Sequence, residues 1–571
     1  MNERIEREND GNILEIENLH LEFRSHGIWR EVVKGVNFSL KKGETLGLVG
    51  ESGSGKSVSA LATMGLLDKN NSKITQGRIL FDSSVDLLQL SEKEMRKYRG
   101  GKIAMIFQEP MTSLNPVVKC GKQVVEMILQ HEDCSKKDAE KKVLELFDEV
   151  LLPNPSRVFD SYPHELSGGQ KQRVMIAMAI ACKPEVLIAD EPTTALDVSV
   201  QKAVLDLIKT VQQKYGMGVV FISHDLGIVH SISDRIAVIY KGSIVETGDR
   251  DSVFLNPQHP YTKGLLACRP SMNERPKRLP TVDDYLNGTN NDNDVITQEE
   301  RSKQHSEIYF QEPILQVRDL EVEYVLNKNL FGKSKKTLKA VDKVGFDLYR
   351  GETLGLVGES GCGKTTLGRA IMQLVENSSG NIVFENRILN CKSHSELKKV
   401  RRDIQIIFQD PYSSLNPKIT VGQAIGEPLK TYSIESNAKK RKALVVEMME
   451  KVGLDASHYD RYPHEFSGGQ RQRIGIARAL ILRPKIVICD ESVSALDVSI
   501  QAQVLNLLAD LKREFGLTYI FISHDLAVVK YVSDRMIVMR KGKVIQIDEA
   551  DKVYSAPSDE YVKTLIDSIP S

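Results

Sequence analysis

The chain has 571 residues, and its 77 basic side chains balance its 77 acidic ones, so the formal net charge is zero. The balance gives no reason to expect a nucleic-acid coat, and the length predicts several domains. No run of 18 apolar residues and no apolar N-terminal signal region occurs, which predicts a cytoplasmic chain that reaches a membrane only through partner chains. Seven scattered cysteines without CxxC spacing argue against a disulfide framework or a zinc cluster.

The two halves of the chain repeat each other. Residues 50–57 match residues 358–365, and Asp190 and His224 recur 300 residues later as Asp490 and His524. Two repeats of this size predict two domains, at 1–270 and 313–571. The segment 271–312 between them is polar and contains Asn and Gly, which predicts a flexible or weakly ordered linker.

A phosphate-binding loop is predicted in each half. Alternating apolar and polar residues predict strands over 13–23 and 32–40, and a short apolar strand over 45–49 leads into the Gly-rich loop and a helix over 58–67. The pattern Gly-x-x-x-x-Gly-Lys-Ser indicates a phosphate-binding loop when it lies between a strand and a helix, because backbone N–H groups can then wrap a β-phosphate. Lys56 would reach the β- and γ-phosphates, and the Ser57 hydroxyl would bind Mg²⁺. The expected nucleotide-binding residues are Gly50, Glu51, Ser52, Gly53, Ser54, Gly55, Lys56, Ser57 and Val58, and their repeats Gly358, Glu359, Ser360, Gly361, Cys362, Gly363, Lys364, Thr365 and Thr366.

A glutamine ends a later strand in each half. Strands are predicted over 78–81 and 102–107, and Gln108 follows the second of them, as Gln409 does in the repeat. Its amide can reach a metal or a water near the γ-phosphate, although a lone loop glutamine is usually structural. Apolar spacing then predicts a helical insertion over 124–152.

Carboxylates and a histidine follow two further apolar strands, predicted over 186–189 and 219–222. Such residues lie at the carboxyl edge of a parallel sheet, where ligands bind. Asp190 and Asp490 are expected to hold Mg²⁺, together with Ser57, Thr365, Gln108 and Gln409. Glu191 and Glu491 are placed to polarise an attacking water, and His224 and His524 would hold the γ-phosphate. The last two strands, 236–240 and 243–246, are predicted to form a hairpin.

A Ser-Gly-Gly-Gln stretch precedes an apolar helical run in each half. The residues are Ser167, Gly168, Gly169 and Gln170, and in the repeat Ser467, Gly468, Gly469 and Gln470. A serine and two glycines at a helix start can seat an anion. The same residues also make an ordinary capped helix start, and both interpretations stay open for one copy.

With phosphate loop, Gln, Ser-Gly-Gly-Gln, Asp-Glu and His in this order, the chain resembles an ATP-binding cassette (ABC) protein twice over. Three elements narrow the resemblance to the ATPases of oligopeptide, dipeptide, nickel and glutathione importers. They are Ser113-Leu114-Asn115-Pro116, its repeat Ser414-Leu415-Asn416-Pro417, and His259-Pro260-Tyr261-Thr262. The first half is similar to the "D" type of subunit in that family and the second to the "F" type.

The resemblance implies an α/β fold of two tandem ABC nucleotide-binding domains, each a RecA-like P-loop core with an antiparallel β subdomain and a helical subdomain. It implies ATP and Mg²⁺ as cofactors, and head-to-tail pairing of the domains, so that each nucleotide lies between one phosphate loop and the other domain's Ser-Gly-Gly-Gln. Asp197 and Asp497 match the family's loop at that interface. The implied partners are two transmembrane permease subunits and an extracytoplasmic solute-binding protein, with no nucleic acid and a peripheral location at the cytoplasmic face of the membrane.

Some positions depart from the family pattern. Val58 stands where the second half has Thr366, so a hydroxyl contact to the α-phosphate is in doubt. Only Cys268 follows the His-Pro-Tyr-Thr element, so no iron–sulfur cluster is expected, and Trp29 is a candidate for stacking on adenine. The alternative class, a twin-cassette ATPase acting on ribosomes or nucleic acid, fits less well because the linker is not helix-periodic and zinc cysteines and a basic patch are missing.

Overall fold

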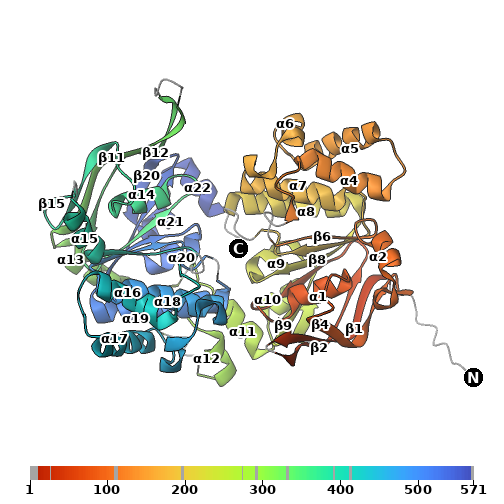
Figure 1. Cartoon of the computed structure of the whole chain (residues 1–571), viewed down its shortest axis with the longest axis horizontal. Coiled ribbons are helices and arrows are strands. Elements are labelled where there is room, and N and C mark those ends of the chain that lie inside the picture. Colours follow the sequence, from red (N-terminus) through yellow and green to blue (C-terminus); the bar gives the residue numbers. More distant parts are fainter. Residues whose placement is uncertain are drawn as a thin grey trace, which may run out of the picture. The chain divides into compact units, whose positions relative to one another are not determined.

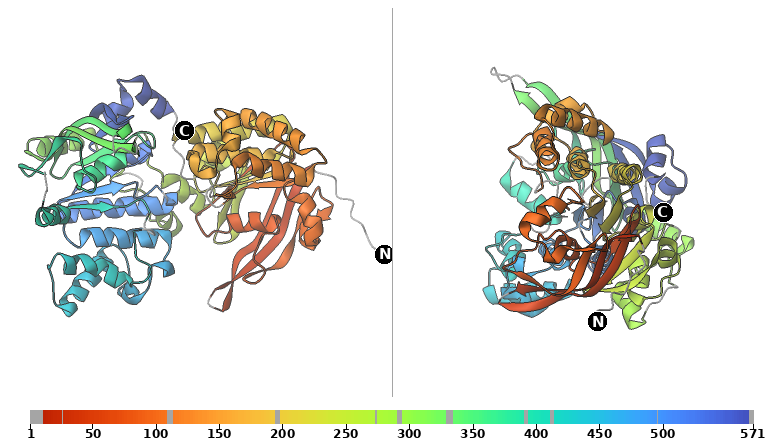
Figure 2. Two further views of the ribbon diagram at one scale, coloured as in Figure 1. Left: turned by 45° about the horizontal axis from the view of Figure 1, so that its top comes forward. Right: turned by 90° about the vertical axis from the view of Figure 1, so that its right-hand side faces the viewer.

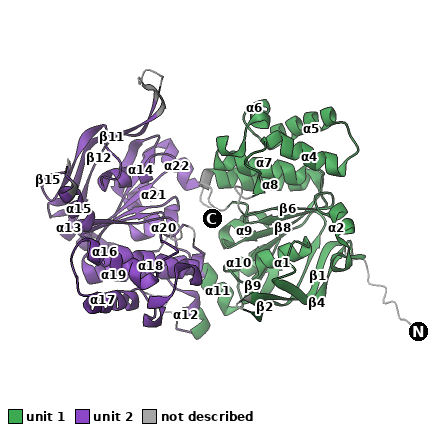
Figure 3. Cartoon of the chain, viewed as in Figure 1, with its two compact units in different colours: residues 1–266, 285–287, 570–571 green, residues 267–284, 288–569 purple. Residues whose placement is uncertain are grey.

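The computed structural model describes residues 11–567 except 26, 109–112, 194–197, 273, 290–293, 329–333, 390–392, 411–413 and 495. The chain divides into two units (Figure 3). The first holds the residues up to Leu266 with Tyr285–Asn287, and the second holds Ala267–Asp284 and the residues from Gly288 to Ile569. Each unit carries one copy of the repeat.

The first unit contains two sheets (Figure 1). Strands β2 (Ile28–Lys41), β1 (Asn12–Ser25), β4 (Ser72–Phe81) and β5 (Val85–Asp86) form an antiparallel sheet in that order. The second sheet has the order β10 (Ser243–Asp249), β9 (Arg235–Tyr240), β3 (Thr45–Val49), β8 (Gly218–Ser223), β7 (Val186–Asp190) and β6 (Ile103–Ile106). All its pairs are parallel except the β9–β10 hairpin. Strands β3, β7 and β8 are buried along their whole length, which is why they read as continuous apolar runs.

Helices cover the parallel sheet and form a separate group beyond it. They are α1 (Lys56–Thr63), α2 (Glu92–Tyr98), α4 (Cys120–His131), α5 (Lys136–Glu149), α6 (Pro155–Asp160), α7 (Gly168–Ile180), α8 (Val198–Tyr215), α9 (Leu226–Ile232), α10 (Arg250–Leu255) and α11 (Pro260–Ala267). Short 3₁₀ turns span Leu87–Gln89 and Pro163–Glu165. Figure 2 shows the red strands β1 and β2 as a layer apart from the orange helices α4 and α5.

Two predicted helices differ in extent. The insertion over 124–152 is broken into α4 and α5, because the chain is extended at Glu132 and Ser135 caps a new helix by accepting a hydrogen bond from the Asp138 backbone N–H. Helix α1 begins at Lys56 and ends at Thr63, before the left-handed Gly65, rather than spanning 58–67.

The second unit repeats this plan. Its antiparallel sheet has the order β12 (Ser334–Tyr349), β11 (Pro313–Lys328), β14 (Ser379–Phe384) and β15 (Arg387–Ile388). Its other sheet has the order β16 (Ile404–Ile407), β17 (Ile486–Asp490), β18 (Thr518–Ile522), β13 (Thr353–Val357), β19 (Arg535–Arg540) and β20 (Lys543–Glu549). The helices are α14 (Lys364–Ile371), α15 (His394–Asp403), α16 (Val421–Thr431), α17 (Ala438–Lys451), α18 (Gly468–Leu480), α19 (Val498–Phe515), α20 (Leu526–Val532), α21 (Ala550–Ser555) and α22 (Glu560–Asp567), with 3₁₀ turns at Ala456–Asp460 and Pro463–Glu465.

The segment 271–312 differs from the expectation of a flexible or weakly ordered linker. It contains α12 (Val282–Asn287) and α13 (Gln298–Tyr309), and Thr297 and Glu300 form a capping box at the start of α13. Arg301 and His305 of this helix are buried. The composition hid this order because the partners of these polar side chains lie more than 200 residues later in the chain, in the same unit.

Candidate ATP sites in the two cassettes

A phosphate loop with the predicted geometry joins β3 to α1. A Cβ at Gly50 would lie 2.2 Å from the Ile239 carbonyl oxygen, and Gly55 caps α1 at φ 106, so both positions require glycine. The buried Lys56 donates from Nζ to the Gly50 and Glu51 carbonyl oxygens, at 2.7 and 2.8 Å. Its ammonium is thereby held inside the loop at the N-terminus of a helix.

The second unit builds the same loop between β13 and α14. Lys364 Nζ donates to the Gly358 and Glu359 carbonyl oxygens, at 2.6 and 3.0 Å. A Cβ at Gly363 would lie 2.1 Å from the Ala340 carbonyl oxygen. Cys362 is buried, with its Sγ 3.9 Å from Lys364 Nζ, so a thiol reagent would reach it poorly.

A hydroxyl and a carboxylate meet beside each loop. Ser57 Oγ donates to Asp190 Oδ1 at 2.9 Å, and Thr365 Oγ1 donates to Asp490 Oδ1 at 2.9 Å. Burial raises the pKa of Asp190 to about 6, although the Ser57 hydrogen bond opposes it, and burial likewise raises the pKa of Asp490. A desolvated carboxylate next to a hydroxyl oxygen suits a small divalent cation such as Mg²⁺, which would supply the missing positive charge.

The glutamate that follows each aspartate contacts the predicted glutamine and histidine of the same unit. Glu191 lies directly after β7 in the left-handed region, at φ 46. Its carboxylate accepts a hydrogen bond from Gln108 Nε2 at 2.8 Å and lies 3.2 Å from His224 Nδ1. Three motifs that together span more than 100 residues, from Gln108 to His224, therefore converge on one carboxylate.

The second unit repeats this arrangement. Glu491, at φ 48, accepts from Gln409 Nε2 at 2.7 Å and lies 3.6 Å from His524 Nδ1. The neighbouring His524 holds the pKa of Glu491 below its usual value. Burial lowers the pKa of His524, yet the interaction with Glu491 outweighs it and the pKa is raised overall. The pair thus favours a charged histidine beside an ionised carboxylate.

The Ser-Gly-Gly-Gln stretches open α7 and α18 as capped helix starts. Ser167 Oγ accepts from the Gln170 backbone N–H at 3.3 Å, and Gln170 Oε1 accepts from the Ser167 N–H at 3.0 Å. Ser467 and Gln470 form the same capping box. A Cβ at Gly169 would lie 2.7 Å from Val200 Cγ1, so this glycine lets α8 pack closely against α7. The ordinary cap is therefore present, and its backbone N–H groups remain compatible with an anion.

Two tyrosines that the motifs alone did not assign also belong to these sites. The Tyr261 hydroxyl accepts a hydrogen bond from the Glu51 backbone N–H at 3.1 Å, and the Tyr561 hydroxyl accepts from the Glu359 N–H at 3.3 Å. Each tyrosine therefore fixes the phosphate loop of its own unit. The signal was present in the sequence, since Tyr561 repeats Tyr261 at the same 300-residue spacing.

The remaining expected residues lie apart from this polar centre or outside the described part. Val58 packs against the core of the first unit. Trp29 lies on β2 opposite Arg24, with Lys73 Nζ 4.6 Å from its ring centre. Asp497 is buried next to α19, whereas Asp197 lies outside the described residues.

Comparison with known proteins agrees with this geometry. The family model described as "ABC transporter" matches residues 33–194 and 341–494. The chain belongs to the ABC transporter family. A second model, "Oligopeptide/dipeptide transporter, C-terminal region", matches residues 245–291. The chain is similar to glutathione import ATP-binding proteins from Escherichia coli O157:H7 (47% identical) and strain K12 (46% identical), over 98% of this chain and 90% of each relative.

These findings confirm the predicted family and fold class, with two tandem ABC cassettes in one chain. They also establish the chain as the ATP-binding, ATP-hydrolysing subunit of an importer of the oligopeptide/dipeptide family. The comparisons do not support the alternative of a twin cassette acting on ribosomes or nucleic acid. Among the described residues, no helix is long and apolar enough to cross a membrane.

Proposed function

We propose that this ATPase powers import of a small peptide, and that glutathione, a tripeptide, is the first solute to test. The glutathione import proteins that match nearly the whole chain support this choice, and so does the match to the oligopeptide/dipeptide C-terminal region. Longer peptides and nickel remain within the range of the family. The solute itself would be selected by partner proteins.

The convergence of Gln, Glu and His in each unit carries the proposed mechanism. Lys56 and Lys364 would offset the charge of the phosphates, and Mg²⁺ held near Ser57 and Thr365 would neutralise charge on the β- and γ-phosphates. Glu191 would then orient or deprotonate the attacking water. Its hydrogen bond from Gln108 fixes the direction of the carboxylate.

In each site, one histidine and one pair of an aspartate with a hydroxyl group complete the set of polar residues. His224 and His524 would hold the γ-phosphate, with the neighbouring Glu favouring the charged imidazole in the second site. Asp190 and Asp490 would hold Mg²⁺. Because both units retain every one of these groups, we expect both to hydrolyse ATP.

We further propose that the two cassettes share their sites. Ser167 and Gly169 would serve the nucleotide held by Lys364, and Ser467 and Gly469 would serve the one held by Lys56. The capped helix starts support this, because they present backbone N–H groups to an anion. Closure on ATP and reopening after hydrolysis would be transmitted to two permease subunits through the Gln108 region and the helical insertion. The chain would work at the cytoplasmic face of the membrane, with an external solute-binding protein.

Two experiments test the proposal. Uptake of labelled glutathione, a longer peptide and nickel is compared between wild-type cells and a deletion strain; unchanged glutathione uptake would exclude glutathione as the solute. Ser467→Arg should abolish hydrolysis at the first phosphate loop while nucleotide binding at the second persists. A defect confined to the second loop would show that the cassettes do not share sites.

A further inference from the structure

A cavity lies between the segment that leads into the second cassette and the second cassette itself. We call residues 274–284 and 294–310 the strap; they belong to the same unit as the cassette they touch. The cavity has a volume of about 370 Å³, within the range of small-molecule sites. The strap forms one wall, and α19, β18 and α20 form the other.

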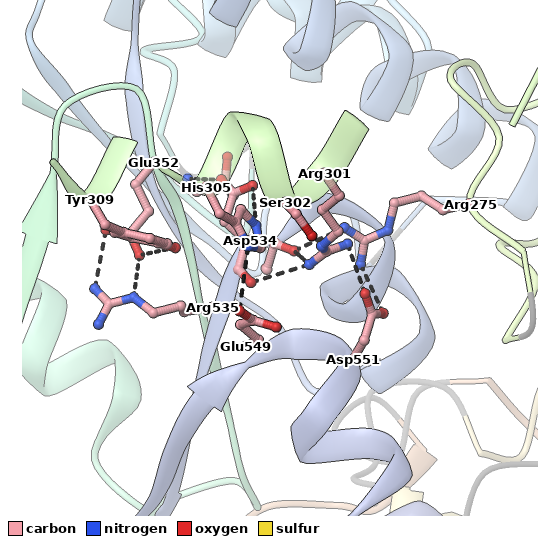
Figure 4. A network of polar contacts seen from close by, with 12 residues as sticks. Arg275, Arg301, Ser302, His305, Tyr309, Glu352, Asp534, Arg535, Glu549 and Asp551 are labelled. Atoms are coloured by element: carbon pink, nitrogen blue, oxygen red, sulfur yellow. Dashed lines mark hydrogen bonds and ion pairs between the residues drawn. The ribbon is translucent and has the colours of Figure 1, made fainter. Parts of the chain in front are cut away.

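Buried polar contacts hold the strap in place. Arg301 Nη2 donates to the Ser533 and Asp534 carbonyl oxygens, at 3.0 and 3.2 Å (Figure 4). Leu279 and Asn506 exchange two hydrogen bonds, at 2.9 and 2.8 Å, between the strap backbone and the buried Asn506 amide. Both walls of the cavity are therefore fixed to each other at its edges.

The cavity joins an apolar wall to a cationic rim. The apolar side chains are Leu505, Leu508, Ala509, Phe521 and Val532. Five basic residues line it, Arg275, Lys277, Arg301, Lys512 and Arg513, against the acidic Glu300 and Asp534. Lys277 pairs with Glu300 at 3.3 Å and Lys512 with Asp534 at 3.5 Å, so the two lining carboxylates are already used.

The three arginines keep capacity for another anion. Arg275 and Arg301 pair with Asp551, and Arg513 pairs with Asp510, but these carboxylates are 48% and 42% exposed, so water weakens the pairs. Arg301 is buried, and its Nη1 lies 3.1 Å from Asp551 Oδ2 without making a hydrogen bond to any described residue. An anion in the cavity could satisfy this N–H group.

Comparing the two halves of the repeat distinguishes this cavity from the ATP sites. The ATP-site residues recur in both halves. Some cavity residues recur as well, since Leu505, Phe521 and Asp534 correspond to Leu205, Phe221 and Asp234, but several others do not. Lys512 and Arg513 stand where the first cassette has Gln212 and Gln213, and Ala509 stands where it has Lys209; Tyr519 and Tyr531 stand where it has Val219 and Ser231. Basic, aromatic and small residues are thus gathered at these positions in the second cassette only.

We propose that the cavity binds a small amphipathic anion, an apolar chain or ring that carries one carboxylate or sulfonate group. The apolar body would lie on α19 and α20, and the anionic group would meet the arginines of the rim. A bound molecule would also contact β18 and α20, the two elements that flank His524.

The test uses the full-length chain and the fluorescent probe 8-anilinonaphthalene-1-sulfonate, whose binding is titrated with decanoate as competitor. Ala509→Phe should fill the cavity and weaken the decanoate-sensitive binding at least tenfold. The matched control in the first cassette, Lys209→Phe, should leave it unchanged. Arg513→Gln changes a side chain that is 76% exposed, and it should weaken the binding of decanoate two- to fivefold.

Three results would overturn the proposal. Ala509→Phe could bind probe as tightly as wild type, or Lys209→Phe could lose binding equally. Decyltrimethylammonium, which has a similar chain and the opposite charge, could displace the probe as well as decanoate does. In the expected case, decyltrimethylammonium competes at least tenfold less well.

Discussion

Replacing Arg301 with methionine should release the strap from the second cassette. Arg301 Nη2 donates to two buried backbone carbonyls, at 3.0 and 3.2 Å. A hydrogen bond from a charged group contributes about 1.5–3 kcal/mol, and one nitrogen serves both carbonyls, so about 3 kcal/mol is lost in all. The ion pair with Asp551 adds little because that carboxylate is 48% exposed. Since about 1.4 kcal/mol is a factor of ten, local opening of the strap should become roughly 150-fold more frequent.

Hydrogen exchange followed by mass spectrometry measures this opening directly. Amides of α13 should exchange roughly 150-fold faster in Arg301→Met than in wild type, while amides of β13 keep their protection. Lys303→Met is the matched control, because Lys303 is exposed on the same helix. Equal exchange of α13 in the two variants would refute the reasoning and restore the expectation of a loosely held linker.

Three further predictions concern the ATP sites and their helices. The double variant Glu191→Gln and Glu491→Gln should retain ATP binding but release phosphate about 10²–10⁴-fold more slowly; wild-type turnover would remove these residues from the mechanism. Because the pKa of Asp190 is raised to about 6, a proton competes with Mg²⁺ below that pH. Calorimetry should show the Mg²⁺ affinity of the first site falling about tenfold per unit below pH 6, and a constant affinity from pH 5 to 8 would contradict the assignment. A Cβ at Gly469 would lie 2.5 Å from Ile500, whereas one at Gly468 meets nothing within 4 Å. Gly469→Ala should therefore lower the thermal unfolding midpoint by roughly 2–10 °C, through about 1–3 kcal/mol of overpacking, and Gly468→Ala should not; equal midpoints would contradict the close packing of α18 and α19.

The sequence alone determined the repeat and the family, and it predicted most of the residues that the structure brings together in each polar centre. This was possible because the glycines, the lysine and the strand-end carboxylates are local features, and strand–loop–helix order fixes their neighbourhood. The boundaries of the helical insertion were harder, since Ser135 and the extended Glu132 interrupt an otherwise continuous apolar spacing.

Only the tertiary structure decided which distant groups touch. The sequence placed Gln108, Glu191 and His224 just after the ends of three strands, but the order of the strands in the sheet and the left-handed turn at Glu191 bring the three side chains together. The strap is the opposite case. Its polar composition predicted a flexible or weakly ordered linker, yet Arg301 and His305 become buried because their partners lie on β20 and on the loop between α20 and β19 of the second cassette. Composition reports the average solvation of a segment, whereas burial depends on partners supplied by another part of the chain.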